Sequence, residues 1–486
     1  MIGDYVYLIA NQPVYYGGTE PIPLPEISSN NKVWAVPVTD VYYFDVPDYS
    51  YIYTNILGIN TQNDNQDVTS KTFLMGYSQS MYVSPENIYI TYMKRVSDFD
   101  LYDRMIDQVF SQIVPSDVKS KIDEIRNSNA TAYEKMQRTG EVFQTYLESL
   151  DPERAANVTK EAQEKAVSVQ REMAKETEKT VVHKISIRNG NIEYQKNGEV
   201  PGRVLNQFSM DEYNGYFRIA TTTGEVSRIG EAISANHVYV LDSSLVVVGK
   251  LEDLAPGERI YSARFIGDRA YMVTFKKIDP LFVIDLKDPQ NPKVLGKLKI
   301  PGYSDYLHPF DENHIIGIGK ETVEAEEGDF AWYQGIKISL FDVSDVNTPK
   351  EVSKYNIGDR GTDSYALQDH KAFLFSKSKN LLVIPILLAE IDEKKYPDGV
   401  APFTYGDFVW QGAYVLDVSL DKGFVLKGRV SHGDEEKLLK SGYYYDSPFS
   451  VKRSLYIDDV LYTVSDKLMK ANSLIDLMDI SRIEIS

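Results

Sequence analysis

The sequence contains no cysteine, and this absence removes several kinds of chemistry at once. Without thiols the chain can form no disulfide framework, no thiolate metal site and no cysteine nucleophile. Tryptophan is also scarce, with three residues, whereas tyrosine occurs 35 times. So many tyrosines, together with a high share of valine and isoleucine, favour strands with one exposed face over helices.

Positive charge is in deficit, because 52 lysines and arginines face 71 acidic residues and leave a net charge of −19 over 486 residues. Such a chain repels phosphate backbones and anionic membrane surfaces, so we expect no nucleic-acid partner. Long apolar runs are also missing, so we expect no transmembrane segment, and the first residues lack the basic-then-apolar order of a secretory signal. The hydrophobic content of 43% is nevertheless ample for a packed core.

A short phrase recurs along the chain. IGDYVYL at 2–8 is echoed by IGDRAYM at 266–272 and by IDDVLYT at 457–463. Each copy places Gly-Asp or Asp-Asp before an alternating apolar run, which is typical of a hairpin. Weaker copies are PENIYIT (85–91), ANHVYVL (235–241), DENHIIG (311–317) and QDHKAFL (368–374).

A second repeat follows the first. Its copies are LFVIDLKDPQNPKVLGKLKIPG (281–302), SLFDVSDVNTPKEVSKYNIGD (339–359) and, more loosely, GAYVLDVSLDKGFVLKGRVSHG (412–433). Together the two repeats define a unit of four strands, most clearly IYSARFI (260–266), AYMVTF (270–275), LFVIDL (281–286) and VLGKLKI (294–300). Units of four antiparallel strands that recur roughly every 45 to 60 residues indicate the blades of a propeller.

We therefore predict an all-β propeller of about seven four-stranded blades, with six to eight compatible with the repeat. The units lie near 1–79, 80–205, 206–258, 259–303, 304–361, 362–433 and 450–486. The first and last blades are predicted to be incomplete, because the first lacks an inner strand and the last has only RIEIS left for an outer one. Residues 5–9 should then be the second strand of a truncated blade and pair with the strand around 51–60.

The repeat is interrupted where the apolar period changes from two to helical. We predict a propeller made of residues 1–98 and 179–486, with a helical insertion at 99–178. Two apolar stripes predict the first two helices of the insertion: Leu101, Met105, Ile106, Val109, Phe110 and Ile113, ended by Pro115, and then Tyr133, Met136, Phe143, Tyr146, Leu147 and Leu150. A third helix should begin with Asp151 as its N-cap and Pro152 at its first position. Two interpretations stay open: helices that pack on one another and on a blade edge, or a protruding surface that contacts a partner.

Several of these segments resemble a known family. FLMGYSQSMYVSPENIYITYMKR (73–95), RFIGDRAYMVTFKKIDPLFVIDLKDPQNPKVLGKLKIPGYSDYLHPFDENHIIGIGKET (264–322) and the helical interruption are similar to the secreted archaeal and bacterial β-propeller family distantly related to WD-type repeats. The resemblance covers essentially the whole chain. It implies a propeller fold and an extracytoplasmic or cell-surface location, and the family's activity is undefined. Members of that family resemble exported proteins that have an N-terminal signal or anchor. They also have further strands before the segment that corresponds to the start of this sequence.

Motifs of catalysis are missing. GYSQS (76–80) is a chance near-match to a nucleophile elbow, and GIGKET (317–322) lacks the spacing of a phosphate loop. The six histidines are dispersed, and His237, His314 and His370 recur at expected hairpin turns, which favours a turn or surface role. We therefore predict no catalytic residues and no cofactor apart from the calcium considered below.

His308 differs from the other histidines because it lies in SDYLHPF, the expected innermost strand of its blade. Innermost strands line the central channel of a propeller, so polar residues there could bind a small ion or peptide at the channel mouth. The alternative is that they hydrogen-bond the channel wall. The candidates are His308, Asp305, Tyr306, Arg264, Ser262, Tyr261, Lys452 and Arg453.

Two weaker kinds of site are also present. TQNDNQD (61–67) offers Asp64 and Asp67, oxygen ligands of the kind that calcium prefers, and EAEEGD (324–329) is a similar charged loop. Both also fit solvated loops. Asn129-Ala-Thr131 and Asn157-Val-Thr159 match the N-glycosylation sequon, and both fall in the helical insertion.

Three hypotheses of function follow. The first is a non-catalytic extracytoplasmic propeller that acts as a binding or assembly module for an unknown protein or cell-surface ligand. The second is a propeller enzyme, a hydrolase or lyase, whose side chains come from separate blades at the channel mouth. The third is a structural subunit of a surface layer or filament, with the helical insertion as a candidate contact surface.

Overall fold

The computed structural model describes residues 1–14, 23–29, 32–44, 51–63, 65–76, 80–95, 101–226, 232–276, 279–326, 330–433 and 447–485. The chain divides into two compact units. Unit 1 comprises Met1–Glu258 with Pro289–Asn291, and unit 2 comprises Arg259–Asp288 with Pro292–Ser486. The two units are described separately.

Unit 1 carries three sheets of the propeller type and one small hairpin, β2 (Glu26–Ser29) with β3 (Lys32–Ala35). Sheet 1 has the order β1 (Tyr5–Pro13), β5 (Tyr51–Asn60), β6 (Thr69–Gly76), β4 (Val41–Tyr43). Sheet 2 consists of β7 (Ser80–Val83), β8 (Asn87–Arg95), β9 (Glu178–Arg188) and β10 (Asn191–Pro201). Sheet 3 has the order β11 (Arg203–Val204), β13 (Tyr216–Thr223), β14 (Ala235–Leu241), β15 (Val247–Leu254), with β12 (Met210–Tyr213) also on β13.

Unit 2 carries four sheets whose strands follow one another in chain order, each antiparallel to the last. Sheet 4 consists of β16 (Arg259–Ile266), β17 (Arg269–Phe275), β18 (Asp279–Asp285) and β19 (Lys293–Ile300). Sheet 5 consists of β20 (Tyr303–Pro309), β21 (His314–Glu324), β22 (Ala331–Asp342) and β23 (Lys350–Ile357). Sheet 6 consists of β24 (Leu374–Ser376), β25 (Leu381–Glu390), β26 (Asp407–Ser419) and β27 (Gly423–Val430). Sheet 7 consists of β28 (Arg453–Ile457), β29 (Val460–Val464), β30 (Leu468–Ser473) and β31 (Asp479–Glu484).

These seven sheets confirm the predicted fold class of about seven blades. The predicted pairing of the first strand is also confirmed, since Tyr5 lies opposite Asn60 and Ile9 opposite Ile56. In sheet 1, β1 lies at an edge and pairs only with β5 among the described strands, whereas the short β4 pairs in parallel with β6 at the opposite edge. In sheet 7, residues 479–484 pair with β30 as a fourth strand.

The turns of the second repeat pack on glycines of the sheet before them. A Cβ atom at Gly249 would lie 2.0 Å from the carbonyl oxygen of Pro289, and one at Gly296 would lie 2.2 Å from that of Val346. Gly249 lies on β15 and Gly296 on β19, each the last strand of its sheet. Pro289 and Val346 belong to the Pro-containing turns before β19 and β23, the last strands of the next sheets. Main chain from successive sheets therefore approaches more closely than any side chain would allow.

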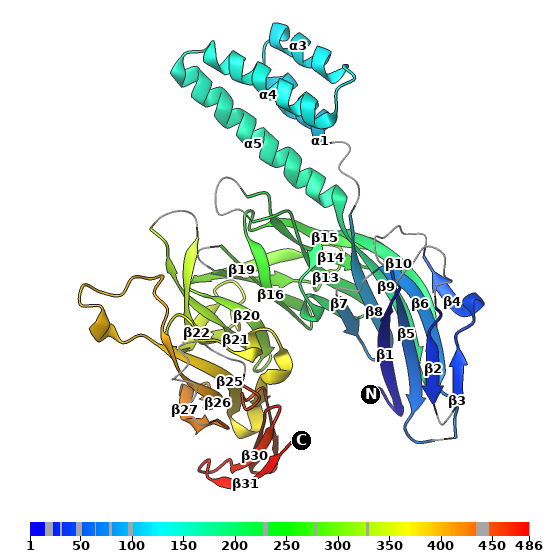
Figure 1. Ribbon diagram of the computed structural model, residues 1–486, viewed down its shortest axis with the longest axis vertical. Coiled ribbons are helices and arrows are strands. Elements are labelled where there is room, and N and C mark those ends of the chain that lie inside the picture. Colours follow the sequence, from blue (N-terminus) through cyan, green and yellow to red (C-terminus); the bar gives the residue numbers. More distant parts are fainter. Residues whose placement is uncertain are drawn as a thin grey trace. The chain divides into compact units, whose positions relative to one another are not determined.

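The helices of unit 1 connect β8 to β9, whose ends Arg95 and Glu178 lie opposite each other (Figure 1). They are α1 (Leu101–Met105), a π-helical turn (Ile106–Phe110), α2 (Ser111–Ile113), α3 (Ser116–Arg126), α4 (Ala132–Glu148) and α5 (Pro152–Thr177). Asp151 caps α5 as predicted, because its carboxylate accepts a hydrogen bond from the main-chain N–H of Arg154 at 2.9 Å. No described helix has an apolar stretch long enough to cross a membrane.

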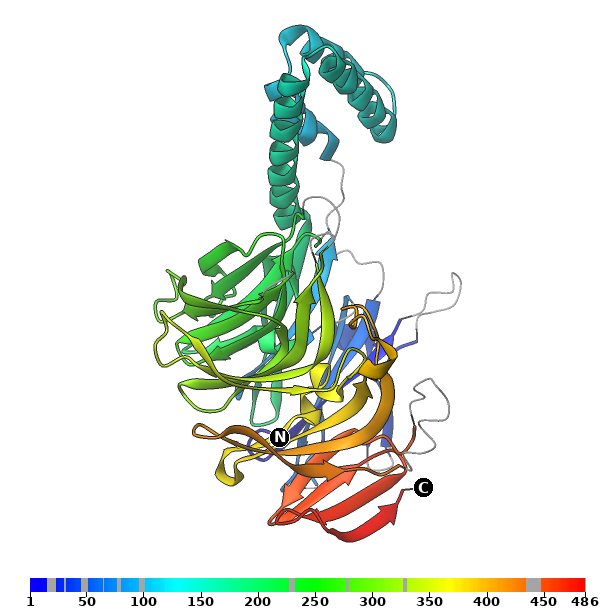
Figure 2. The same cartoon turned by 90° about the vertical axis from the view of Figure 1, so that its left-hand side faces the viewer.

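The first apolar stripe of the insertion divides between two partners. Ile106 packs with Val118 and Ile122, whereas Val109 packs with Val169 and Met173 of α5. Figure 2 shows the long helix α5 upright with the shorter helices near its upper end, and the chain continues from α5 directly into β9. The insertion therefore has a small apolar core of its own.

His237 does not have the predicted turn or surface role. It lies in β14 and is fully buried, where its Nε2 is 2.9 Å from the hydroxyl of Thr223. Burial lowers its pKa to about 4. His314 does lie beside a turn, at the start of β21, with Nδ1 2.7 Å from the carboxylate of Asp311.

Candidate functional site

Two inner strands of unit 2 carry a bulge at the same place. The pairing of β16 with β17 shifts between Ile260 and Ser262, and that of β20 with β21 shifts between Ser304 and Tyr306. The residues left out of the ladder are Tyr261 and Asp305, both of them predicted site residues. Bulges turn a side chain away from the regular alternation, and they are over-represented beside functional sites.

Asp305 belongs to a charged group that the sequence did not predict. Nζ of Lys320, on β21, lies 3.2 Å from Oδ1 of Asp363 and also donates to the carbonyl oxygen of Thr362. Burial raises the pKa of the Asp305 carboxyl to about 7, with Lys320 opposing the rise and Asp363 adding to it. The site therefore combines a carboxylate that is paired with a lysine and a buried carboxyl group, Asp305, whose pKa is raised to about 7.

The inner strand of sheet 6 is interrupted. Leu374–Ser376 pair with the start of β25, and Asp363 pairs with Leu387 further along, but two 3₁₀ turns, Tyr365–Leu367 and His370–Ala372, stand between them. Pro385 lies in β25 opposite this interruption, and its carbonyl oxygen accepts a hydrogen bond from the hydroxyl of Ser364 at 2.5 Å. Because proline has no N–H to donate, a regular strand could not pair fully there.

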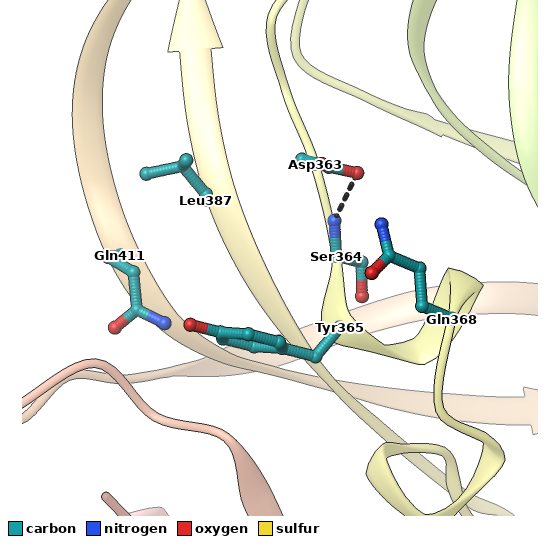
Figure 3. Close-up of a pocket in the computed structure, with 6 residues that line it drawn as sticks. All are labelled: Asp363, Ser364, Tyr365, Gln368, Leu387 and Gln411. Carbon is teal, nitrogen blue, oxygen red and sulfur yellow. Dashed lines mark hydrogen bonds between the residues drawn. The ribbon is translucent and has the colours of Figure 1, made fainter. Parts of the chain in front are cut away.

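A pocket with a volume of about 120 Å³ lies at this interruption. Its lining residues are Asp363, Ser364, Tyr365, Gln368, Leu387 and Gln411 (Figure 3). The Gln411 amide is fixed, because it donates to the carbonyl oxygen of Val451 and accepts from the Val451 N–H, both at 3.0 Å. The hydroxyl end of Tyr365 points toward Gln411. The pocket thus has a rigid wall of uncharged polar groups and one carboxylate.

Tyr306 and His308 form a second group. The Tyr306 hydroxyl lies 3.0 Å from Nδ1 of His308, and the imidazole packs on Phe373 and Phe375 with ring centroids 5.0 and 5.1 Å away. Burial lowers the pKa of His308 to about 4, and the positive charge of Arg264 adds to the effect. The imidazole is therefore neutral at physiological pH and packs as part of an aromatic cluster.

The other predicted residues have separate partners. Arg453 forms an ion pair with Asp369 at 2.5 Å, and this hydrogen bond lowers the pKa of Asp369. Lys452 pairs with Asp466 at 2.7 Å, and its Nζ lies 6.0 Å from the centroid of the Tyr365 ring, on the pocket wall.

Ser262 and Tyr261 also face neighbours within unit 2. The Ser262 hydroxyl donates to the carbonyl oxygen of Ser304 at 2.6 Å, and the Tyr261 hydroxyl lies 3.1 Å from that of Tyr333. Among the predicted residues, Tyr306 and His308 are thus brought into direct hydrogen-bonding contact with each other. Lys320, Asp363 and the pocket wall were not predicted, because QDHKAFL reads as one more hairpin and hides the interruption.

The predicted metal and glycosylation sites are only partly described. Asp64 and part of EAEEGD lie outside the described residues, so the predicted calcium sites stay predictions. Among the residues that the structure does describe, no three ligating side chains are grouped to hold a metal ion. Asn129 is exposed between α3 and α4, and Asn157 is exposed on α5.

Comparison with known proteins identifies the fold family. A family model for the beta propeller domain matches residues 1–477 of the chain. The chain belongs to the beta propeller domain family. In this beta propeller, the seven sheets described above are the blades, as the sequence repeat predicts.

Two relatives of this beta propeller are uncharacterized archaeal proteins. One, from Methanocaldococcus jannaschii, is 36% identical over 436 residues, which is 90% of this chain and 60% of the relative. Another, from Archaeoglobus fulgidus, is 32% identical over 389 residues, which is 79% of this chain and 58% of the relative. The propeller chain therefore spans about 60% of the length of the curated relatives it matches.

Solved structures similar to this beta propeller are far more distant in sequence. The periplasmic gluconolactonase PpgL of Pseudomonas aeruginosa has 7% identity and a TM-score of 0.38, over 89% of this chain and 92% of that one. BamB from Moraxella catarrhalis has 9% identity and a TM-score of 0.32, over 62% and 72% of the two chains. Apo AztD from Citrobacter koseri has 13% identity and a TM-score of 0.35, over 63% and 70%.

Proposed function

We propose that this beta propeller is a non-catalytic, extracytoplasmic binding module, and that its ligand enters the pocket at the interrupted inner strand of sheet 6. The interruption carries the proposal. A regular strand would fill the edge of β25, whereas here two 3₁₀ turns leave an opening of about 120 Å³ beside Asp363. The extracytoplasmic location rests on the family resemblance of the sequence.

The pocket is built on a rigid scaffold, as a preformed binding site requires. Lys320 holds Thr362 and Asp363 from the neighbouring sheet, and Gln411 is fixed by two hydrogen bonds to Val451. Binding would therefore cost little reorganisation of the wall. Gln368 is exposed at the opening and can turn toward a ligand.

The test is a thermal-shift screen of the purified chain against named probes: neutral monosaccharides and disaccharides, amino acids, dipeptides and calcium. A ligand that binds the folded state raises the unfolding temperature. We expect at least one probe to do so for wild type and for Gln144→Ala, which changes an exposed glutamine on α4. The same probe should have a much smaller effect on Gln368→Ala and Asp363→Asn. An equal effect on all four proteins would contradict the proposed site.

A second candidate function is an enzyme with Asp305 as a general acid or base. One observation favours it: the pKa of Asp305 is raised to about 7, in the range where a carboxyl group can both donate and accept protons. Wild type, Asp305→Asn and His308→Ala should be assayed on a panel of chromogenic glycosides and peptides. Turnover that disappears in Asp305→Asn would favour the enzyme over the non-catalytic module.

A further inference from the structure

A row of aromatic side chains borders the pocket region of unit 2. We call Trp332, Tyr333, Phe403 and Tyr405 the aromatic rim. Three of the four are exposed, with 36% of Tyr333, 57% of Phe403 and 66% of Tyr405 accessible to solvent. Trp332 and Phe403 lie side by side with ring centroids 5.8 Å apart. Exposed aromatic rings grouped in this way are characteristic of surfaces that bind something.

Arg360 holds the rim in place. Its guanidinium carbon lies 5.1 Å from the centroid of Trp332 and 4.4 Å from that of Tyr405. The guanidinium also donates to the carbonyl oxygen of Tyr333 at 2.8 Å and to the hydroxyl of Tyr405 at 3.2 Å. One cation thereby fixes a ring on the strand β22 and a ring in the segment before β26, so their exposed faces are preorganised.

The rim continues into the pocket through the main chain. Arg360 stands three residues before the pocket residue Asp363, and a Cβ atom at Gly361 would lie 3.5 Å from the Tyr405 ring. Asp363 is held by Lys320, as described above. The short segment from Arg360 to Asp363 therefore connects the aromatic rim to the polar pocket within unit 2.

We propose that the pocket and the rim bind a neutral saccharide chain, with one sugar unit in the pocket and the next units along the aromatic rim. The inference rests on the proposed function and names its ligand class. A sugar ring presents a face of C–H groups, which stack on the electron-rich face of an aromatic ring, and an edge of hydroxyls, which both donate and accept hydrogen bonds. The rim offers the first kind of contact. Tyr365, Gln368 and Asp363 offer the second.

Size and charge both favour this ligand. Pockets for drug-sized molecules have volumes of about 300–1,000 Å³. At about 120 Å³ this pocket is smaller, so it accepts one unit of a ligand that extends beyond it. An anion would face Asp363, whereas a cation would compete with Lys320 for Asp363 and with Arg360 for the rings. An uncharged ligand meets neither penalty.

The experiment is affinity electrophoresis of the full chain in gels that contain soluble glucan, mannan or xylan, with pectin and a proline-rich peptide as charged and peptide probes. We expect one neutral polysaccharide to retard the wild type. Removing one ring of the rim should weaken its apparent affinity by about fivefold or more in Tyr405→Ala and Phe403→Ala. Tyr133→Ala is the matched control, because Tyr133 is 80% exposed on α4, in unit 1.

Each outcome bears on the inference. Retardation that is weakened in the two rim variants and kept in Tyr133→Ala supports it. Equal retardation of Tyr405→Ala and wild type would overturn the inference. Retardation by pectin alone, or binding of the peptide alone, would overturn it as well. If Gln368→Ala loses binding of a non-saccharide probe in the thermal-shift screen, the saccharide inference fails and the proposed function stands. If wild type responds to no probe in either experiment, both fail.

Discussion

Nζ of Lys320 lies 3.2 Å from Oδ1 of Asp363, across the boundary between two neighbouring sheets of unit 2. The lysine side chain is only 14% exposed, whereas that of Asp363 is 51% exposed. The pair marks the residue at which the inner strand of sheet 6 leaves its regular course. It also supplies the positive charge that opposes the raised pKa of Asp305.

Replacing Asp305 by asparagine should make the protein more stable at pH 8 and leave it unchanged near pH 4. The folded pKa of about 7 lies above the ordinary value of 3.8, so between these values the folded protein holds a proton that the unfolded chain has released. The contribution of Asp305 to stability therefore falls as the pH rises from 4 to 7. Asparagine removes this loss, which is on the order of 4 kcal/mol. Urea unfolding of both proteins at pH 4, 6 and 8 measures it, and parallel pH curves would contradict the assignment.

His308→Asn should reduce the loss of stability in acid. The folded pKa of about 4 lies below the ordinary 6.5, so between these values the unfolded chain takes up a proton that the folded protein does not. The contribution of His308 to stability therefore falls as the pH drops from 6.5 to 4. The variant should flatten this fall by on the order of 3 kcal/mol.

The measurement is the slope of the unfolding temperature against pH. The unfolding temperature at neutral pH alone is not suitable, because the substitution also changes the packing around residue 308. Three other histidines retain the same effect in the variant, since burial lowers the pKa of His183, His237 and His432 to about 4 as well. The slope should therefore shrink without vanishing. An unchanged slope would show that His308 is protonated in the folded protein.

Gly296→Ala should destabilise unit 2. The new methyl group would stand 2.2 Å from the carbonyl oxygen of Val346, and main chain cannot move aside as a flexible side chain does. We expect a loss of about 1 to 3 kcal/mol in the free energy of unfolding. Gly140→Ala is the control, because a Cβ atom at Gly140 has no neighbour within 4 Å. In the helix α4 it should be stabilising by about 1 kcal/mol. Similar effects of the two substitutions in thermal unfolding would contradict the close approach.

The helical insertion should be replaceable by a short turn. Arg95 and Glu178 lie opposite each other at the ends of β8 and β9, so an Asn-Gly turn in place of 96–177 would close an ordinary hairpin. The replacement loses few contacts with the sheets, among them the 2.8 Å ion pair of Lys175 with Asp253. We expect the unfolding temperature to fall by about 5 °C or less. Failure to fold would show that the insertion is part of the propeller's core.

The same variant tests the hypothesis of a structural subunit. If the full chain assembles at high concentration and the replaced chain stays monomeric in light scattering, the insertion is the contact surface. Lys175→Ala is the control, because it removes the ion pair with Asp253 and keeps the helices. Assembly that persists without the insertion would place the contact elsewhere.

The sequence by itself determined the secondary structure and the repeat. Apolar alternation predicts the four strands of sheet 4 within about two residues, and Asp151 with Pro152 predicts the start of α5. These features depend on neighbours a few residues apart, which periodicity and capping chemistry report directly. Local signals were insufficient at the last strand, where RIEIS resembles only a remnant of a strand but Asp479–Glu484 form a strand that pairs with β30.

Only the tertiary structure decided which side chains meet. Lys320 and Asp363 are 43 positions apart, and Arg360 joins Trp332 on β22 to Tyr405, which is 73 positions further along the chain. The interruption opposite Pro385 was also hidden, because the residues that form it resemble another copy of the hairpin repeat. Periodicity shows which face of a strand or helix a residue occupies. It carries no information on which side chain of the neighbouring sheet that residue will contact. The pocket and the aromatic rim arise from such partnerships, and the packing of neighbouring sheets sets them.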